Sequence, residues 1–412
     1  MPSVPLPSRS CARPRSSAPG GLIAYYFEMS NSGSLAGLKI IELAGIGPAP
    51  FCAMMLADHG AEVIRLVPPG AERAGMFDLS KDVLARSRKF MIVDLKQPAA
   101  VGTVRDLCKT ADGLIEGFRP GVMERLGLGP EQLLKDNPRL AYGRMTGWGQ
   151  TGPRARTAGH DINYIALSGV LDCVGRAGDK PTPPINLIGD FGGGGMMLAF
   201  GMLAAILHAQ KTGQGQVIDC AMVDGSALLA SMIWGLAAQG AWSDKRGSNM
   251  LDSGAHFYDT YACADGSHIS IGPIEAKFYS EFLHRLGIPE TTDFARQHDR
   301  TGWPSLKEKL AAVFATKTRQ EWCAVFEGSD ACVAPVLSMA EAPGDPHNAE
   351  RKTFTKVGGV MQPRPAPRFS ATPASEPVMA KLTAGTDSAA LLRAIGYGDE
   401  RIDSLRASGA IY

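Results

Sequence analysis

Residues 38–66 decide the fold, and they read LKIIELAGIGPAPFCAMMLADHGAEVIRL. The first seven residues, LKIIELA, are mostly apolar and predict a short strand. A turn rich in glycine and proline at 45–48 interrupts it, and residues 50–59 then have helical spacing before Gly60, which favours a helix end. The last six residues, AEVIRL, predict a second strand. A strand, a tight turn, a helix and a second strand open a doubly wound sheet, so we expect an α/β fold.

The chain that follows continues this pattern of short strands and helices. Further strands are expected at 90–94, 113–116 and 140–145. Helices are expected at 99–110, 161–170, 196–209 and 219–239. The longest uncharged apolar run, from Phe191 to Ala209, begins with a glycine run and contains His208, so it predicts a buried helix and not a membrane span.

After Ala241 the pattern changes to a second, smaller α+β region. Two segments typical of strands, 255–262 and 267–271, flank Ala264-Asp265-Gly266, which favours a hairpin turn. Helices are expected at 278–286, 306–314 and 319–326. The stretch 341–377 is rich in proline and polar residues and predicts extended chain, and a helix at 388–395 is expected to close the chain.

The composition excludes several classes of protein. A chain of 412 residues that is 45% hydrophobic and 20% charged is typical of a globular protein of two or three domains. The 42 Lys and Arg against 41 Asp and Glu leave a net charge of +1, which argues against a nucleic-acid or membrane-surface partner. The eight cysteines form no CxxC pair, so we expect reduced thiols and no metal site.

The first 33 residues form an extension that differs from the rest. Residues 1–27 contain no Asp, Glu or Lys, and their charges are Arg9, Arg13 and Arg15 among serine and proline. One alternative is an organellar transit peptide, which would place the protein in mitochondria. The other is a disordered or non-native extension before a start at Met29, which the prolines favour because they weaken an amphipathic helix. Residues 1–33 are excluded from the fold prediction.

The turn at 45–50 (GIGPAP) raises the question of a nicotinamide cofactor. It has two glycines of the dinucleotide fingerprint, but Pro50 replaces the third. The second strand ends near Arg65, where a nicotinamide site requires an acid to bind the ribose hydroxyls. An arginine suits a phosphate instead. We therefore expect no nicotinamide site, and we interpret the glycines as a tight turn.

Several unusual strings occur between Leu35 and about Phe369. They are LAGIGPAPFCAMMLADHGAEVIRL (43–66), EGFRPGVMERLGLGP (116–130), MTGWGQTGP (145–153), AGHDINYIALSGVL (158–171), PINLIGDFGGGG (184–195), GQGQVIDCAMVDGS (213–226), NMLDSGAHFYDTY (249–261), GPIEAKFY (272–279) and DACVAPVL (330–337). Together they resemble the racemase branch of the family III CoA-transferase superfamily. GHDINY and NLIGDFGGG are specific to that branch.

The resemblance implies an interlocked homodimer in which each chain threads through its partner. It also implies a large Rossmann-like CoA-binding domain at 34–225, completed by 340–412, and a small α+β domain at 255–339, with a linker helix region at 226–254. The active site is then expected where the large domain of one subunit meets the small domain of the other.

The implied activity is inversion of the α-carbon of 2-methylacyl-CoA thioesters through an enolate, with CoA as part of the substrate and no other cofactor. Such a reaction requires two acid/base groups on opposite faces of the carbon. His160, at the start of a predicted helix, and Asp190, on a predicted turn before a glycine run, are the candidate pair. The N–H of Asp161 is a candidate donor to the enolate oxygen, because helix N-termini carry free N–H groups.

The resemblance also assigns supporting residues. It places Glu275 of the partner subunit against His160, and Asn186 near Asp190. Three departures from the family pattern put substrate range and partner-side geometry in question. They are Pro68 in place of a second arginine, Pro273 beside Glu275, and His256 in place of a proline.

The phosphates of coenzyme A require cations and backbone donors. The basic candidates in the first domain are Arg65, Arg86, Arg88, Lys89, Lys96 and Arg119. The family's CoA segment corresponds to Val93, Asp94, Leu95 and Lys96, and the GHDINY string adds Gly159, Ile162, Asn163 and Tyr164. Met196 and Met197 are candidates for contact with the acyl chain.

Two other functions stay open. A family III CoA-transferase would use Asp190 as a nucleophile that forms a covalent aspartyl-CoA intermediate, and it would not need His160. An inactive acyl-CoA-binding protein is the third alternative. The chain ends in Ala410-Ile411-Tyr412, which is not a peroxisomal signal of the SKL type, so a cytoplasmic protein is expected.

Overall fold

A computed structural model describes residues 33–70, 79–289, 291–380 and 386–412. Residues 1–32 of the predicted N-terminal extension lie outside the described residues.

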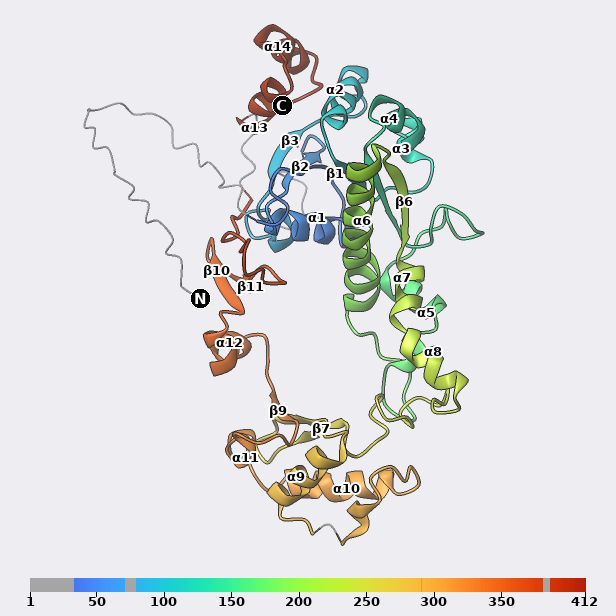
Figure 1. The fold of residues 1–412 in the computed structure, drawn as a ribbon, viewed down its shortest axis with the longest axis vertical. Coiled ribbons are helices and arrows are strands. Elements are labelled where there is room, and N and C mark those ends of the chain that lie inside the picture. The colour runs from blue at the N-terminus through green and yellow to red at the C-terminus, as the bar shows by residue number, and fades with distance from the viewer. Residues whose placement is uncertain (1–32, 71–78, 290, 381–385) are drawn as a thin grey trace, which may run out of the picture. The chain divides into compact units, whose positions relative to one another are not determined.

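A six-stranded parallel sheet forms the centre of the large part of the chain (Figure 1). Its strands lie in the order β3-β2-β1-β4-β5-β6. Their bounds are β1 Lys39–Leu43, β2 Glu62–Val67, β3 Lys89–Ile92, β4 Gly113–Glu116, β5 Ala141–Thr146 and β6 Gln216–Ala221. The order reverses between β1 and β4, and in such sheets ligands bind outside the carboxyl ends of the strands at that point. The predicted α/β fold is confirmed.

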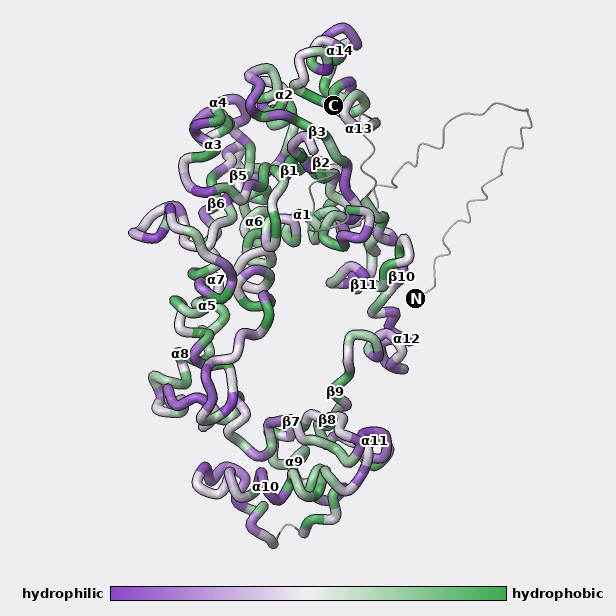
Figure 2. The backbone as a smooth tube through the Cα atoms, turned by 180° about the vertical axis from the view of Figure 1, so that it is seen from behind, coloured by the Kyte–Doolittle hydropathy of each residue, from purple (hydrophilic) through white to green (hydrophobic). Residues whose placement is uncertain are grey.

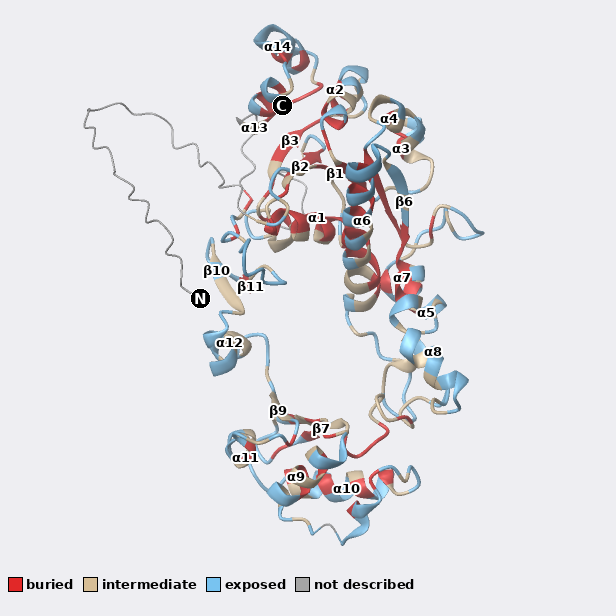
Figure 3. Cartoon of the chain, in the orientation of Figure 1, coloured by how far each residue is buried: buried red, intermediate tan, exposed pale blue. Residues whose placement is uncertain are grey.

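Helices cover both faces of this sheet because its strands are apolar on both sides. The helices of this part of the chain are α1 Pro48–Asp58, α2 Pro98–Lys109, α3 Val122–Arg125, α4 Pro130–Asp136, α5 Asp161–Leu167, α6 Met197–Thr212, α7 Met222–Leu229 and α8 Ser231–Ala238. Of these, α2 packs on one face and α1 and α6 on the other, whereas α8 has no buried residue. Neighbouring residues of β1 point to opposite faces of the sheet and belong to different hydrophobic cores. Ile41 lies in the core that contains Val104 of α2, and Ile40 lies in the core that contains Met202 of α6. Strands β1 to β5 are accordingly buried along most of their length, whereas the edge strand β6 is largely exposed (Figure 3).

The predicted buried helix at 191–209 is more complex in the structure. Residues Leu187–Met196 form a π-helical segment, which α6 continues. One face of α6 is buried through Leu198 and Met202, but Phe200 and Leu207 on the other face are exposed. The continuous run Leu187–Thr212 is long and apolar enough to cross a bilayer, and 44% of its most apolar window is buried within the chain (Figure 2). Core helices of soluble proteins pass the same test.

The single helix predicted at 219–239 is wrong. The structure has β6 up to Ala221, then α7, a break at Ala230, and α8. Pairing with β5 extends β6 to Ala221 through the partner Thr146, so tertiary pairing overrides the apolar run that favoured a helix.

The smaller region is built on an antiparallel sheet in the order β7-β8-β9. Its elements are β7 Asp259–Ala262, β8 His268–Ile271, α9 Ala276–Leu286, α10 Trp303–Phe314, α11 Arg319–Phe326 and β9 Val333–Val336. The predicted hairpin around Asp265 is confirmed. This region has its own aromatic core, in which Phe282 stacks on Phe314 and Phe326.

The last part of the chain corrects two predictions. The stretch 341–377 is not simply extended, because it contains α12 Pro346–Glu350 and a hairpin of β10 Phe354–Val357 and β11 Val360–Pro363. The helix α13 Thr386–Ala394 does not close the chain, since α14 Asp399–Ala407 follows it.

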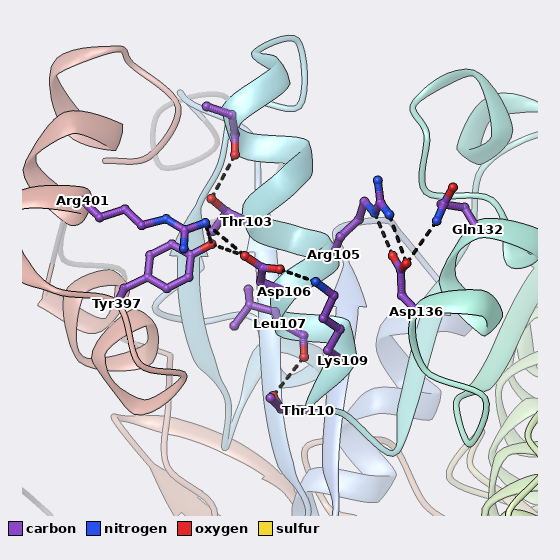
Figure 4. Close-up of polar contacts among 11 residues, drawn as sticks. Thr103, Arg105, Asp106, Leu107, Lys109, Thr110, Gln132, Asp136, Tyr397 and Arg401 are labelled. Atoms are coloured by element: carbon purple, nitrogen blue, oxygen red, sulfur yellow. Dashed lines mark hydrogen bonds and ion pairs between the residues drawn. The ribbon is translucent and has the colours of Figure 1, made fainter.

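The C-terminal helices return to the large sheet. Ile411 pairs with Val93 beside β3. Tyr397 and Arg401 both donate hydrogen bonds to Asp106 of α2, over 2.7 Å and 3.1 Å, and Lys109 binds the same carboxylate (Figure 4). This polar cluster anchors the end of the chain to the first domain.

Candidate active site

The sequence predicts that Asp190 lies on a turn. In the structure it lies inside the π-helical segment Leu187–Met196 instead. The glycine run that follows it allows close packing: an added Cβ at Gly194 would meet Pro48 of α1 at 2.9 Å and Met222 of α7 at 3.0 Å. Only a segment without side chains can enter this space. π-helical turns are rare and occur mainly at functional sites.

The carboxyl group of Asp190 is held between a side chain and a backbone turn. Asn186 Nδ2 donates a hydrogen bond to Asp190 Oδ2 over 3.0 Å. On another side lies Gly47, at the end of the turn that follows β1, where an added Cβ would come within 3.2 Å of the same oxygen. Gly47 has φ +69°, so it is required both for its conformation and for this approach. The sequence had suggested only a tight turn here.

Asp161 is the first residue of α5, and its side chain is buried. Its Oδ1 accepts a hydrogen bond from the main-chain N–H of Asp190 over 2.7 Å. Sequence reasoning had assigned a role only to the N–H of Asp161 and missed its carboxylate. No local pattern points to this contact, because the two residues are 29 positions apart.

His160 directly precedes α5 and is exposed. Its main-chain N–H donates to Asn163 Oδ1 over 3.0 Å. The preceding residue, Gly159, accepts a hydrogen bond from the hydroxyl of Tyr164, whose ring packs edge-on against Trp148 at 4.7 Å. The side chains of Asn163 and Tyr164, both in the GHDINY string, therefore hold the backbone of Gly159 and His160.

Electrostatics link His160 to Asp190. Burial raises the pKa of Asp190, the hydrogen bond from Asn186 lowers it, the charge of Asp161 raises it, and the charge of His160 lowers it. The net effect is a raised pKa. A carboxyl group in this environment exists as an acid over a wider pH range than an exposed aspartate, which suits proton donation.

Arg119 is the predicted CoA-binding cation that the structure brings to this site. Burial and the charge of Asp190 raise the pKa of Tyr164, and the charge of Arg119 lowers it. Arg119 therefore lies near Tyr164, and it is exposed. Ile162 and Asn163 are exposed on α5. Beside them a hollow of about 380 Å³ is lined by Trp148, Arg154, Ala158, Asn163, Ala166 and Leu167.

Three predicted phosphate-binding arginines are buried in ion pairs instead. Arg65 donates to Glu42 over 3.0 Å and to the carbonyl of Gly45 over 3.0 Å. Arg86 is 1% exposed and binds both carboxylate oxygens of Asp58. In this arrangement their guanidinium groups support the fold. Arg88, also buried, donates to Glu42 over 2.8 Å.

The predicted CoA segment at 93–96 lies at the end of β3. Val93 is buried, and the main-chain N–H of Asp94 donates to the carbonyl of Ala410 over 3.1 Å. Leu95 is partly buried, and Lys96 is exposed with its N–H bound to Asp94 Oδ1. Lys89 of β3 pairs with Glu62 over 2.6 Å. Of this group, Lys96 offers an exposed cation.

Glu275 belongs to the smaller region, where it directly precedes α9 and is exposed. Its carbonyl accepts the N–H of Tyr279 over 2.9 Å. Within the described part of the chain, the side chain of Glu275 has no hydrogen bond or ion pair with His160.

Comparisons with known proteins show the family of the chain. The family model described as CoA-transferase family III matches residues 35–384. The chain is 46% identical to the α-methylacyl-CoA racemase of Mus musculus, over 90% of this chain and 96% of that protein. It is 45% identical to the human protein of the same name, over 92% of this chain and 97% of that protein. Human succinyl-CoA:glutarate CoA-transferase is 28% identical over 93% of this chain and 91% of its own length.

Solved structures share the fold. The crystal structure of Rv3272 from Mycobacterium tuberculosis matches with a TM-score of 0.71 at 27% identity, covering 87% of this chain and 99% of that chain. A CAIB/BAIF family protein from Brucella suis matches in fold with a TM-score of 0.75 at 24% identity, covering 88% of this chain and 100% of that chain.

Proposed function

The chain belongs to CoA-transferase family III, and we propose that it is an isomerase that inverts the α-carbon of 2-methylacyl-CoA thioesters. The relatives at 45–46% identity carry the name α-methylacyl-CoA racemase. The observation that supports the proposal is that Asp190, whose raised pKa suits an acid, lies close enough to His160 for the charge of His160 to act on it.

The proposed mechanism uses two bases that share one proton. Neutral His160 takes the α-proton from one face, and the electron pair of the broken C–H bond moves into the enolate. Protonated Asp190 then gives its proton to the opposite face of the α-carbon. The reverse reaction begins with protonated His160 and ionised Asp190, so both directions use the same total protonation of the pair.

The negative charge of the enolate oxygen requires a donor in place before the reaction. We propose the main-chain N–H of Asp161, which is one of the first N–H groups of α5. These groups have no acceptor within their own helix. Its position next to His160 in the chain places the donor beside the base.

Coenzyme A enters as part of the substrate, and no other cofactor is proposed. Arg119 and Lys96 are the exposed cations proposed to bind its phosphates. Arg65 supports the binding region indirectly, since it holds the carbonyl of Gly45 in the turn that faces Asp190.

We further propose a homodimer whose active site includes Glu275 of the partner subunit, as a hydrogen-bond partner that orients His160. Exposed apolar side chains support a large interface. Phe200 and Leu207 on α6, and Met232 and Trp234 on α8, are all exposed in the single chain. Patches of this kind mark surfaces that bind another protein.

Subunit mixing tests the shared site. The variants His160→Ala and Glu275→Gln are each expected to be weakly active as homodimers. Co-expression gives heterodimers in which one site combines intact His160 with intact Glu275, so activity should recover. No recovery, with heterodimers demonstrated by mass, would contradict the placement of Glu275 but not the reaction.

The reaction itself is tested in heavy water. Each epimer of a 2-methylacyl-CoA should gain deuterium at the α-carbon and yield both epimers. His208→Ala, which alters an exposed histidine of α6, serves as a control that should retain this activity. Transfer of CoA to a free acid with the α-proton retained would establish the alternative, in which Asp190 is a nucleophile. Hydroxylamine trapping of Asp190 would detect its aspartyl-CoA intermediate.

A further inference from the structure

The carboxylate of Asp161 has an unusual environment. It is buried at the first position of α5, where Oδ1 accepts the N–H of Asp190 over 2.7 Å. Oδ2 is buried and has no hydrogen-bond partner within the described residues. Leaving a carboxylate oxygen unpaired in a protein interior has a free-energy cost. A purely structural capping role does not require a charged group, since a serine or asparagine caps equally well.

The bond joins two segments of the site. The N–H of Asp190 is one of the first N–H groups of the π-helical segment, which lack partners within that segment. Asn186, the residue that precedes the segment, makes no capping bond to its backbone. The acceptor comes instead from α5, whose preceding residue is His160. A single hydrogen bond therefore connects the backbone of one proposed base to the neighbour of the other.

The chain is shaped to permit this contact. A Cβ added to Gly189, next to Asp190, would overlap Oδ1 of Asp161 and approach a methyl group of Ile165 at 3.2 Å. A side chain at position 189 would therefore push the carboxylate away.

We propose that the Asp161 carboxylate is a positioning residue that sets the geometry of the His160–Asp190 pair and holds a negative charge beside Asp190. This inference rests on the proposed function. It goes beyond the enolate-binding role of the Asp161 N–H, because it assigns a separate task to the side chain.

The charge has a consequence for proton transfer. The groups that act on the pKa of Asp190 are Asp161, which raises it, and His160 and Asn186, which lower it, in addition to burial. Asp190 and Asp161 in turn raise the pKa of Tyr164, and Arg119 lowers it. Loss of the Asp161 charge should lower the pKa of Asp190. The acidic limb of the bell-shaped profile of kcat/KM then moves to lower pH in both directions of the reaction.

The central test is Asp161→Asn, which keeps an oxygen acceptor for the Asp190 N–H and removes the charge. We expect the acidic limb to move to lower pH. The matched control is Asp219→Asn: Asp219 also accepts a main-chain N–H, that of Gln150 over 3.1 Å, and does not act on Asp190. Its profile should stay in place. A lowered rate for Asp161→Asn with an unmoved limb would show a merely structural role and overturn the proposal.

A second variant tests geometry without a change of charge. Gly189→Ala should displace the carboxylate and reduce kcat/KM by roughly 100-fold, as expected for a misplacement of about 1 Å. Full activity in a folded Gly189→Ala protein would also overturn the proposal.

A measurement without turnover separates this inference from the proposed function. Carbon-13 NMR of labelled aspartate follows the titration of Asp190 in the parent protein and in Asp161→Asn, with Asp190→Asn used for assignment. A lowered Asp190 pKa supports the inference even if no acyl-CoA is racemised. Absence of α-proton exchange in the parent protein would reject the proposed reaction alone.

Discussion

Asn186 donates a hydrogen bond from its side-chain amide to Oδ2 of Asp190 over 3.0 Å. The two residues are four positions apart and lie at the start of the π-helical segment. The bond stabilises the ionised carboxylate and so lowers its pKa, whereas burial raises it. The protonation of Asp190 thus depends on a balance of opposing effects, and each can be removed separately.

Removal of this donor gives the first prediction. Asn186→Ala should raise the pKa of Asp190, because the ionised form loses its hydrogen bond. The acidic limb of the kcat/KM profile should move to higher pH, opposite to the effect expected for Asp161→Asn. Profiles of the two variants measured in the same buffers check this. If the acidic limbs of the Asn186→Ala and Asp161→Asn profiles moved in the same direction, the assigned contacts would be contradicted.

The second prediction concerns the two bases. His160→Ala and Asp190→Ala should each reduce kcat/KM for epimerisation by at least about 100-fold, the usual contribution of one general acid or base. Binding of a substrate analogue, measured by calorimetry, should change little, since neither residue is proposed to bind the phosphates. Retained epimerisation in either variant would remove that residue from the mechanism.

The third prediction concerns Arg119, the exposed cation near Tyr164. Arg119→Gln should raise KM by about 10-fold, as expected for loss of a charge-assisted hydrogen bond, with little change in kcat. The difference from the parent protein should shrink as ionic strength increases, because salt screens exposed charges. An effect on kcat alone, independent of salt, would argue against phosphate binding.

The fourth prediction separates Arg86 from the CoA-binding residues. Arg86→Gln leaves the buried carboxylate of Asp58 without its partner, so the free energy of unfolding should fall by about 3–5 kcal/mol. Chemical denaturation measures this loss, and the exposed Arg139→Gln serves as control. A stable Arg86→Gln protein with raised KM would restore the phosphate-binding role that the sequence had suggested.

The fifth prediction follows from His256, which replaces the proline usual in the family. Tyr279 donates its hydroxyl to the carbonyl of Phe294 over 3.1 Å, so it accepts the Nε2–H of His256 over 2.6 Å. Nδ1 of His256 is then unprotonated, buried and without a partner within the described residues. Burial lowers the pKa of His256 from 6.5 to about 4.

Because the folded pKa is lowered, the unfolded chain binds the proton first as pH falls. The stability that neutral His256 contributes is present above pH 6.5 and decreases as pH falls toward 4, by roughly 3 kcal/mol in total. Denaturation of the parent protein at several pH values, compared with His256→Phe, checks this. Equal acid sensitivity of the two proteins would show that another group titrates.

Local sequence patterns predicted much of the fold. The strand at 113–116 and the helix at 319–326 have the predicted bounds. The sequence pattern gave a wrong prediction at 219–221. These residues were expected to begin a helix, but they form the end of β6, which pairs with β5. The pattern also failed for Asp190, whose glycine neighbours suggest a turn when read alone. In the folded chain the same glycines let a π-helical segment pack against α1 and α7.

The candidate site divides in the same way. The strings around His160 and Asp190 predicted the two proposed bases, and Asn186 lies where the family resemblance placed it, beside Asp190. The basic residues were less predictable, because an arginine near a strand end has the same local pattern whether it binds a phosphate or a buried carboxylate. Folding brings Arg86 to Asp58 and to Gln362, 276 positions away, and so removes it from the set of free cations.

The amino-acid sequence alone therefore determines the alternation of strands and helices and the family motifs. It also determines the chemical nature of the two proposed bases. All of these depend on residues within a few positions of one another. The contacts that tune those bases arise only in three dimensions. Asp161 reaches Asp190, and Gly47 opens space beside its carboxyl group, because the ends of parallel strands and the packed helices bring distant residues to one edge of the sheet. Burial and neighbouring charge, which set the protonation of Asp190, are properties of that packing.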